Sequence, residues 1–152
     1  IWCNNPCIIK EMVKFIPNAV VYYGAISDKE RDEAVWKFNN DPECRWFIGN
    51  PSCCKEGLTL LGYSPDNDQG FNCDTVIRFN CDWSLVKYLQ SNDRCHRRGT
   101  RVPITYKSYI VLNSIDDEIA ARVNEKAQQA EDWQDIKAIM ERVLTIAPEA
   151  DE

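Results

Sequence analysis

The sequence predicts an α/β fold of three layers, with a parallel β-sheet between helices on both faces and a helical extension at the carboxyl end. Short runs rich in β-branched and aromatic residues alternate with amphipathic helical stretches of about 10–15 residues. Strands connected through helices pair in parallel, and both faces of such a sheet are buried. With 152 residues, of which 44% are hydrophobic, the chain has the size and composition of one domain with a sizeable core.

The amino-terminal half is expected to form strands at residues 1–3, 19–23 and 45–48 and helices at residues 6–16 and 28–39. Asn5 suits the cap of the first helix, because its side chain accepts a backbone hydrogen bond and Pro6 fits the first helical position. Ser27 and Glu30 have the spacing of a capping box, which predicts the start of the second helix. These signals place a helix after each of the first two strands.

The carboxyl-terminal half is expected to contain a loop leading to a short helix at 51–60, strands at 75–79 and 104–112, and helices at 84–94, from Ser114 or Asp116 to about Ala130, and at 133–144. The strand at 104–112 is predicted to be the longest. Residues 61–72 are expected to form a polar surface loop, because they include Gly62, Pro65 and Gly70.

Acidic residues are concentrated at the carboxyl end. Residues 116–152 hold eleven of the 24 acidic residues and four of the 18 basic ones, which leaves residues 1–115 nearly neutral. We therefore divide the chain into a main domain, residues 1–115, and acidic helices, residues 116–152, that pack on it or extend from it. The run Asp116-Asp117-Glu118 suits a helix amino terminus rather than a Mg²⁺ site. The net charge of −6 neither requires nor excludes DNA as a partner.

Eight cysteines are many for this length. Their spacing lacks the paired Cys-x2-Cys motif typical of zinc sites, and nothing indicates secretion. Free, mostly buried thiols without a metal are therefore the favoured interpretation, with a zinc site or disulfides as alternatives. The sequence has no apolar stretch long enough for a bilayer and no visible signal peptide, so we expect no membrane partner. Because Ile1 lies inside a predicted strand, we expect a fragment of a longer protein.

The segment from Gln90 to Thr100 carries the strongest functional signal. Arg94 and Arg97 are three residues apart in a helix-compatible sequence, so both point to the same side, with Gln90 one turn before Arg94. Guanidinium groups stay charged and present planar donors that fit phosphate oxygens. Such pairs neutralise charge on a transferring phosphoryl group, although a solvated basic helix end contains the same residue types.

This segment resembles the last motif of ATPases of the Swi/Snf type, Gln-x-x-Asp-Arg-x-His-Arg-x-Gly-Gln, at every fixed position except Thr100. Three further stretches are similar to that family: Tyr23-Gly24 with Arg31 and Phe38-Asn39, Glu56-Gly57-Leu58-Thr59-Leu60, and Thr75-Val76-Ile77 with Asp82-Trp83-Ser84. Thr59 stands where the family has Asn or Asp. The resemblance covers residues 1–125. It implies a RecA-like fold of the P-loop NTPase type, as in the second, C-terminal lobe of superfamily-two DNA helicases and translocases.

By this resemblance, Arg94 and Arg97 are the catalytic residues, which reach across a cleft to the γ-phosphate of ATP, and Arg97 is the better candidate for stabilising the transition state. Four residues are expected to orient the arginines, bridge the lobes or line the nucleotide: Gln90, Asp93, Gly57 and Thr59. Thr59 is equally compatible with an ordinary position at the start of a helix.

Contacts to DNA are expected from Gly24, Asn50 and Ser52, which stand at matching places in the family. Each of them also fits ordinary turn chemistry. Contacts to phosphates carry no sequence information, so the resemblance implies sequence-independent binding. Because ligands of parallel sheets bind outside the carboxyl ends of the strands, we expect one cleft to be formed by Gly24, the loop from Asn50, Asn80–Asp82 and the segment after Arg94.

The chain lacks the Gly-x4-Gly-Lys-Ser/Thr phosphate loop. The resemblance therefore implies that ATP and Mg²⁺ are held mainly by an N-terminal RecA-like lobe of the same protein, and the isolated chain is expected to be inactive. A non-catalytic RecA-like module that binds DNA or protein is the main alternative, and an unrelated small nucleotide-binding protein is another. The compact sequence favours the cytoplasm of a bacterial or phage-infected cell, or the nucleus in a eukaryote.

Overall fold

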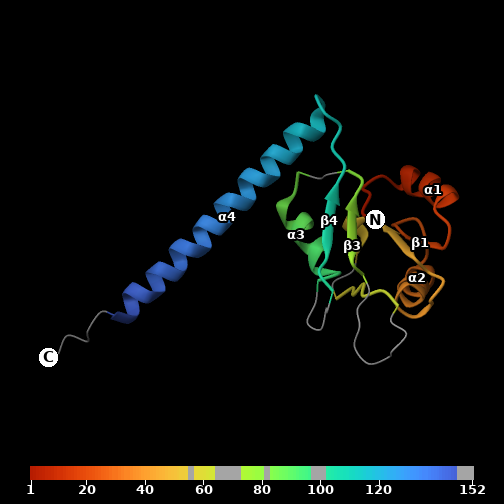
Figure 1. Ribbon diagram of the computed structural model, residues 1–152, viewed down its shortest axis with the longest axis horizontal. Helices are drawn as coiled ribbons and strands as arrows, with labels where there is room; N and C mark the ends of the chain where they lie inside the picture. The colour runs from red at the N-terminus through yellow and green to blue at the C-terminus, as the bar shows by residue number, and fades with distance from the viewer. Residues whose placement is uncertain (55–56, 64–72, 81–82, 97–101, 147–152) are drawn as a thin grey trace.

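The computed structural model describes residues 1–54, 57–63, 73–80, 83–96 and 102–146, with the backbone alone for 131–146. Its elements are helix α1 (Pro6–Phe15), strand β1 (Ala19–Tyr22), helix α2 (Asp28–Asn40), strand β2 (Trp46–Gly49), the 3₁₀ helix η1 (Pro51–Cys53), strand β3 (Thr75–Arg78), helix α3 (Leu85–Asp93), strand β4 (Thr105–Ser108) and helix α4 (Ile115–Ile146) (Figure 1). The predicted cap of α1 is confirmed, because the Asn5 side chain accepts the Cys7 N–H at 2.9 Å.

The first residues of the chain join two pairs of parallel strands into one sheet. β1 pairs with β2, and β3 pairs with β4. Trp2 forms parallel bridges to Gly49 on one side and to Arg78 on the other. Its amide donates to the Ile77 carbonyl at 2.7 Å, and its carbonyl accepts from the Phe79 amide at 2.9 Å. The order across the sheet is therefore β1, β2, the Trp2 segment, β3 and β4, which confirms the predicted parallel sheet, and the amino terminus lies in its middle (Figure 1).

Both faces of the inner strands are buried. The core on one face contains Trp2, Tyr22, Phe38, Phe47, Leu60 and Val76, and the core on the other contains Cys3, Ile9, Tyr23 and Ile48. Because consecutive strand residues point to opposite faces, β1, β2 and the Trp2 segment contribute to both cores, whereas β3 contributes Val76 to the first. Phe38 comes from α2 and Ile9 from α1, so these helices cover opposite faces. The predicted three-layer arrangement is therefore confirmed.

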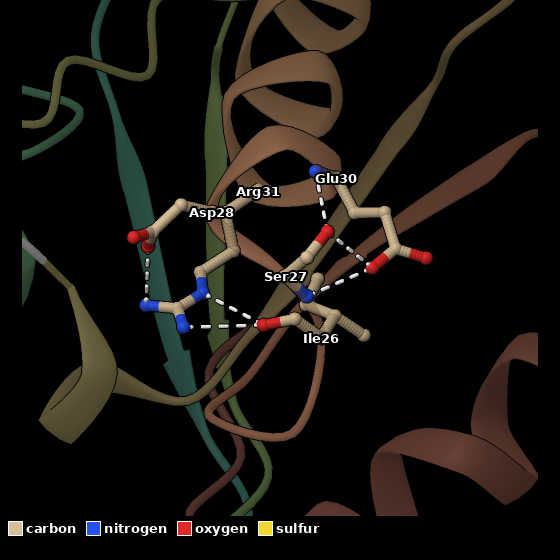
Figure 2. Close-up of polar contacts among 5 residues, drawn as sticks. All are labelled: Ile26, Ser27, Asp28, Glu30 and Arg31. Atoms are coloured by element: carbon tan, nitrogen blue, oxygen red, sulfur yellow. Dashed lines mark hydrogen bonds and ion pairs between the residues drawn. The ribbon is translucent and has the colours of Figure 1, made fainter.

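Helix α2 begins with the capping box that the sequence predicted (Figure 2). The Ser27 hydroxyl accepts the Glu30 N–H at 3.3 Å, and the Glu30 carboxylate accepts the Ser27 N–H at 2.8 Å. The Ser27 hydroxyl also donates to the Glu30 carboxylate at 2.7 Å, and this bond together with that from the Ser27 N–H lowers the pKa of Glu30. Arg31 fixes the preceding turn, because its Nε and Nη2 donate to the Ile26 carbonyl at 3.2 and 3.1 Å, while Nη1 lies 3.4 Å from the Asp28 carboxylate. A cap of this kind contributes about 1 kcal/mol.

Strand β4 is shorter than predicted. It ends at Ser108, and the last ladder hydrogen bond joins the Tyr109 amide to the Arg78 carbonyl at 2.9 Å. Arg78 is the final residue of β3, so the β-prone residues after Tyr109 have no described strand beside them. Val111 and Leu112 are consequently 65% and 76% exposed. The strand at 104–112 was predicted from residue type, but pairing decides where a strand ends.

Helix α4 is a single helix of 32 residues, where the sequence predicted two. Residues 115–146 contain no glycine or proline and are rich in helix formers, so nothing local ends the helix near Ala130. Ile119 and Val123 are buried one turn apart, and Lys126 donates to the Trp83 carbonyl at 3.0 Å. The start of α4 therefore packs at α3, and the rest extends away from the sheet (Figure 1). The division at residue 115 stays a prediction.

Within the described part of the chain, no helix combines the length and the apolar character needed to cross a bilayer.

Gly49→Ala should destabilise the domain. An added Cβ would lie 2.7 Å from Phe47 Cε1 and 2.9 Å from Trp2 Cζ3, and both rings are buried. Overpacking of this kind costs about 1–3 kcal/mol. Urea unfolding followed by tryptophan fluorescence should show a lower midpoint with an unchanged slope. Gly24→Ala is the matched control, because its nearest atom would be 3.4 Å away. Equal midpoints for Gly49→Ala and the unaltered chain would contradict the prediction.

Candidate nucleotide and DNA sites

The predicted site residues fall into two groups at opposite edges of the sheet. Gly24, Asn50 and Ser52 follow the carboxyl ends of β1 and β2. Arg94 follows α3, which returns the chain to the edge where β4 begins, so it lies at the amino ends of the strands. Gly57 and Thr59 belong to this second group through the contacts described below. The expectation of one cleft at the carboxyl ends is therefore wrong for Arg94, because α3 carries its last residues to the opposite edge. Residues 81–82 and 97–101, which belong to the same prediction, lie outside the described residues.

Asparagines form a hydrogen-bonded cluster at the carboxyl edge. Asn50 is 7% exposed, and its side chain donates to the Asn4 carbonyl at 3.0 Å and accepts the Ser52 N–H at 2.9 Å. The Asn4 amide donates to the Asn80 side chain at 2.9 Å. The Asn50 side chain therefore fixes the turn from Asn50 to Ser52 against the Asn4 segment, whereas Ser52 and Gly24 are exposed. The sequence placed Asn80 in the predicted cleft without a role and missed Asn4, although an asparagine after each of three neighbouring strands was a usable signal.

Asn39 holds the loop that contains Gly57 and Thr59 at the amino edge. Its side chain donates to the Thr59 carbonyl at 3.0 Å and accepts the amides of Leu61 and Gly62 at 2.8 and 3.2 Å. The Thr59 hydroxyl donates to the Gly57 carbonyl at 3.2 Å. Gly57 has a φ of +81°, a backbone conformation that glycine adopts without strain. Asn39 stands in the quoted Phe38-Asn39 pair, but the sequence alone assigned it no role.

Arg94 connects this loop to the end of α3. Its carbonyl accepts the Leu60 amide at 2.9 Å, and its Nη1 lies 3.5 Å from the Leu58 carbonyl. The guanidinium is also close to the Cys54 thiol. Burial raises the pKa of Cys54 to about 12, and the charge of Arg94 opposes that rise. Arg94 is half-buried, and its Nη1 faces the Leu58 carbonyl of the loop.

Of the remaining predicted residues, two lie on α3 and one follows it. Gln90 and Asp93 are exposed on α3. Arg97 lies outside the described residues. A cavity of about 740 Å³ opens at the amino edge and is lined by residues from several elements, including Trp46, Leu60, Thr75 and Cys95.

The described residues do not form a metal site. Among them, no three His, Cys, Asp or Glu side chains are grouped so as to hold a metal ion. The seven described cysteines are free thiols.

The comparison with known families identifies the class of protein. The family described as "Helicase conserved C-terminal domain" matches residues 4–99, and the chain belongs to this family. The matched range includes both groups of site residues. The relatives are helicases of the Swi/Snf type, so the chain is a C-terminal RecA-like helicase lobe of that type.

Particular relatives support this assignment. The chain is 32% identical over 103 residues to Lymphoid-specific helicase of Homo sapiens, which covers 68% of this chain and 11% of that protein. It is 31% identical over 96 residues to TATA-binding protein-associated factor mot1 of Schizosaccharomyces pombe, covering 63% and 4%. The fold is similar to the crystal structure of the C-terminal part of the Fun30 ATPase domain, with a TM-score of 0.66 and 20% identity over 80% of this chain and 37% of that one. The chain spans a small part of the curated relatives' length.

Cys54 should react slowly with iodoacetamide at pH 8, because a pKa of about 12 leaves roughly one thiol in ten thousand as the reactive thiolate. Exposed Cys7 is the internal control and should be alkylated much faster. Peptide mass spectrometry at pH 8 to 11 should show Cys54 labelling rise with pH. The raised pKa means that the folded state holds the Cys54 proton more tightly, so this contribution to stability is complete below about pH 9 and is lost toward pH 12. Equal labelling of Cys7 and Cys54 at pH 8 would contradict the assigned environment.

Proposed function

We propose that the chain is the second motor lobe of an ATP-dependent DNA helicase or translocase. The observation that carries the proposal is the hydrogen-bonded unit formed by Arg94 and the loop at Leu60, within the range matched by the helicase family. In this proposal ATP and Mg²⁺ are bound mainly by an N-terminal RecA-like lobe of the same protein, and this lobe supplies the arginines. We place the protein in the compartment that contains its DNA, which is the cytoplasm of a bacterial or phage-infected cell or the nucleus of a eukaryotic cell.

Arg94 and Arg97 are the proposed catalytic residues. When water attacks the γ-phosphorus and the bond to ADP breaks, negative charge grows on the transferred oxygens, and guanidinium groups stabilise it. The Leu58 carbonyl lies near Arg94 Nη1 and engages part of that side chain. Arg97 is therefore the stronger candidate for the γ-phosphate, and Arg94 for joining the loop to the nucleotide.

The same geometry supports a link between DNA and nucleotide. The segment from Asn50 to Leu60 begins at the carboxyl edge, where Ser52 and Gly24 are exposed, and ends at the amino edge beside Arg94. A DNA phosphate bound by the amides and hydroxyl of the first group is thus connected to the arginine group through one short segment. Contacts of this kind are sequence-independent and weaken with salt.

The roles of Gln90, Asp93, Gly57 and Thr59 follow from the same proposal. Gln90 and Asp93 lie exposed on α3, where they are accessible to a second lobe. Gly57 and Thr59 shape the loop beside Arg94. We assign these four residues to the interface between the lobes and to the nucleotide.

Arg97→Ala in the longer protein should lower DNA-stimulated ATP hydrolysis by about 10³-fold, because the charge on the transferred phosphoryl group loses its partner. ATP binding should be retained, since the first lobe holds the nucleotide. Steady-state hydrolysis and equilibrium binding of a fluorescent ATP analogue measure the two effects. Arg122→Gln, at an arginine whose side chain is 61% exposed on α4, is the control and should keep the normal rate. Normal turnover by Arg97→Ala would favour the non-catalytic binding module.

The isolated 152-residue chain should hydrolyse no ATP, with or without DNA. Arginines without a bound triphosphate and an oriented water have no charge to stabilise. Release of radioactive phosphate, measured at high protein concentration, checks this. Turnover by the purified chain that persists in Arg94→Ala and Arg97→Ala preparations indicates a contaminant, whereas turnover abolished by both changes would overturn the proposal of a divided site.

A further inference from the structure

Arg78 is a buried cation between the sheet and α3. It is 3% exposed and is the last residue of β3. The two hydrogens of its Nη2 are shared among three acceptors on α3: the Tyr88 carbonyl at 3.2 Å, the Ser91 hydroxyl at 3.1 Å and the Asn92 side-chain oxygen. The guanidinium carbon lies 3.8 Å from the centre of the Tyr88 ring. Four contacts from one side chain thus converge on the second half of α3.

These contacts specify the position of the helix. A buried charge is costly unless it is hydrogen-bonded, so a shift of α3 that broke them would leave the cation without compensation. The planar guanidinium also fixes the directions of its donors. Ser91 strengthens the arrangement, because its hydroxyl donates to the same Tyr88 carbonyl at 2.8 Å. Apolar packing alone is less directional, since it depends mainly on the area that is buried.

The fixed half of α3 leads directly to Arg94. The Asn92 carbonyl accepts the amides of Cys95 and His96, both at 3.1 Å, and the Arg94 carbonyl accepts the Leu60 amide at 2.9 Å. Asn92 therefore contacts Arg78 through its side chain and the Arg94 turn through its backbone. Arg94 is only two residues beyond Asn92, so the position of Asn92 constrains the position of the Arg94 backbone.

We propose that Arg78 is a positioning residue: it fixes the end of α3 against β3 and thereby sets where Arg94 and the residues after it enter the nucleotide site. Arg78 touches neither the substrate nor the reacting atoms. The catalytic consequence rests on the function proposed above, while the structural consequence does not. A displacement of about 1 Å at a catalytic group can lower turnover by up to a hundredfold.

The test compares Arg78→Gln and Arg78→Lys with the unaltered longer protein. Arg78→Gln should lower kcat of DNA-stimulated ATP hydrolysis at least tenfold, with KM for ATP unchanged within about twofold, since nucleotide binding belongs to the other lobe. Arg78→Lys should recover part of the rate, because an ammonium keeps the charge over Tyr88 but lacks the planar geometry that directs the guanidinium donors. Rates are normalised to the folded fraction of this lobe, measured by urea unfolding, because ATP binding reports only on the other lobe. Arg122→Gln is the control for loss of an arginine.

Amide hydrogen exchange of peptides covering residues 85–96 is the readout that needs no activity. In Arg78→Gln these peptides should exchange at least tenfold faster, while peptides from α1 and α2 should be unchanged. If Arg78→Gln does not fold, Asn92→Ala removes one acceptor and is judged by the same criteria.

Normal kcat together with normal exchange would overturn the proposal, as would faster exchange with normal kcat in an active enzyme. If the unaltered protein hydrolyses no ATP, the proposed function fails separately. Exchange over residues 85–96 then decides alone whether Arg78 fixes the end of α3.

Discussion

The sheet depends on the insertion of the Trp2 segment between β2 and β3. Its backbone hydrogen-bonds to both neighbours, and without it the described strands would form two separate pairs. The Trp2 ring then packs on Phe47, whose ring also contacts Tyr22 and Phe38 at centroid distances of 5.6–6.1 Å. Aromatic pairs of this geometry contribute about 0.5–1.5 kcal/mol each beyond burial. Gly49 is required beside them, because the two rings occupy the space of a side chain.

Parallel pairing explains why the candidate site has two parts. Every crossover helix returns the chain to the amino edge, so a residue that follows a strand and one that follows a helix lie on opposite edges. Exposed Gly24 and Ser52 are at one edge, and Arg94 is at the other. Hydrogen bonds from polar side chains then fix each part: Asn50 at the carboxyl edge and Asn39 at the amino edge. In the function proposed above, DNA is contacted at one edge and the nucleotide at the other.

Much of the fold was predictable because its signals are local. The caps at Asn5 and Ser27, and the alternation of strands with helices, depend on neighbouring residues, and the structure confirms them. The length of β4 and the continuity of α4 were predicted wrongly. A strand ends where its neighbour ends, as β4 does beside Arg78, and a helix continues where nothing breaks it. The roles of Asn4, Asn39 and Arg78 were missed, because each contacts residues distant in the sequence.

The sequence by itself determined the class of fold, the helicase motifs and the identity of the arginines, since these follow from residue types and short spacings. The predicted catalytic and DNA-binding roles of these residues stay predictions. Only the tertiary structure decided that Gly24 and Ser52 lie at the opposite edge of the sheet from Arg94. It also decided that the Asn50 side chain hydrogen-bonds within the domain and that Arg78 hydrogen-bonds to α3. The physical reason is that periodicity and capping report which element a residue joins, whereas hydrogen bonds between distant elements depend on how the whole chain is packed.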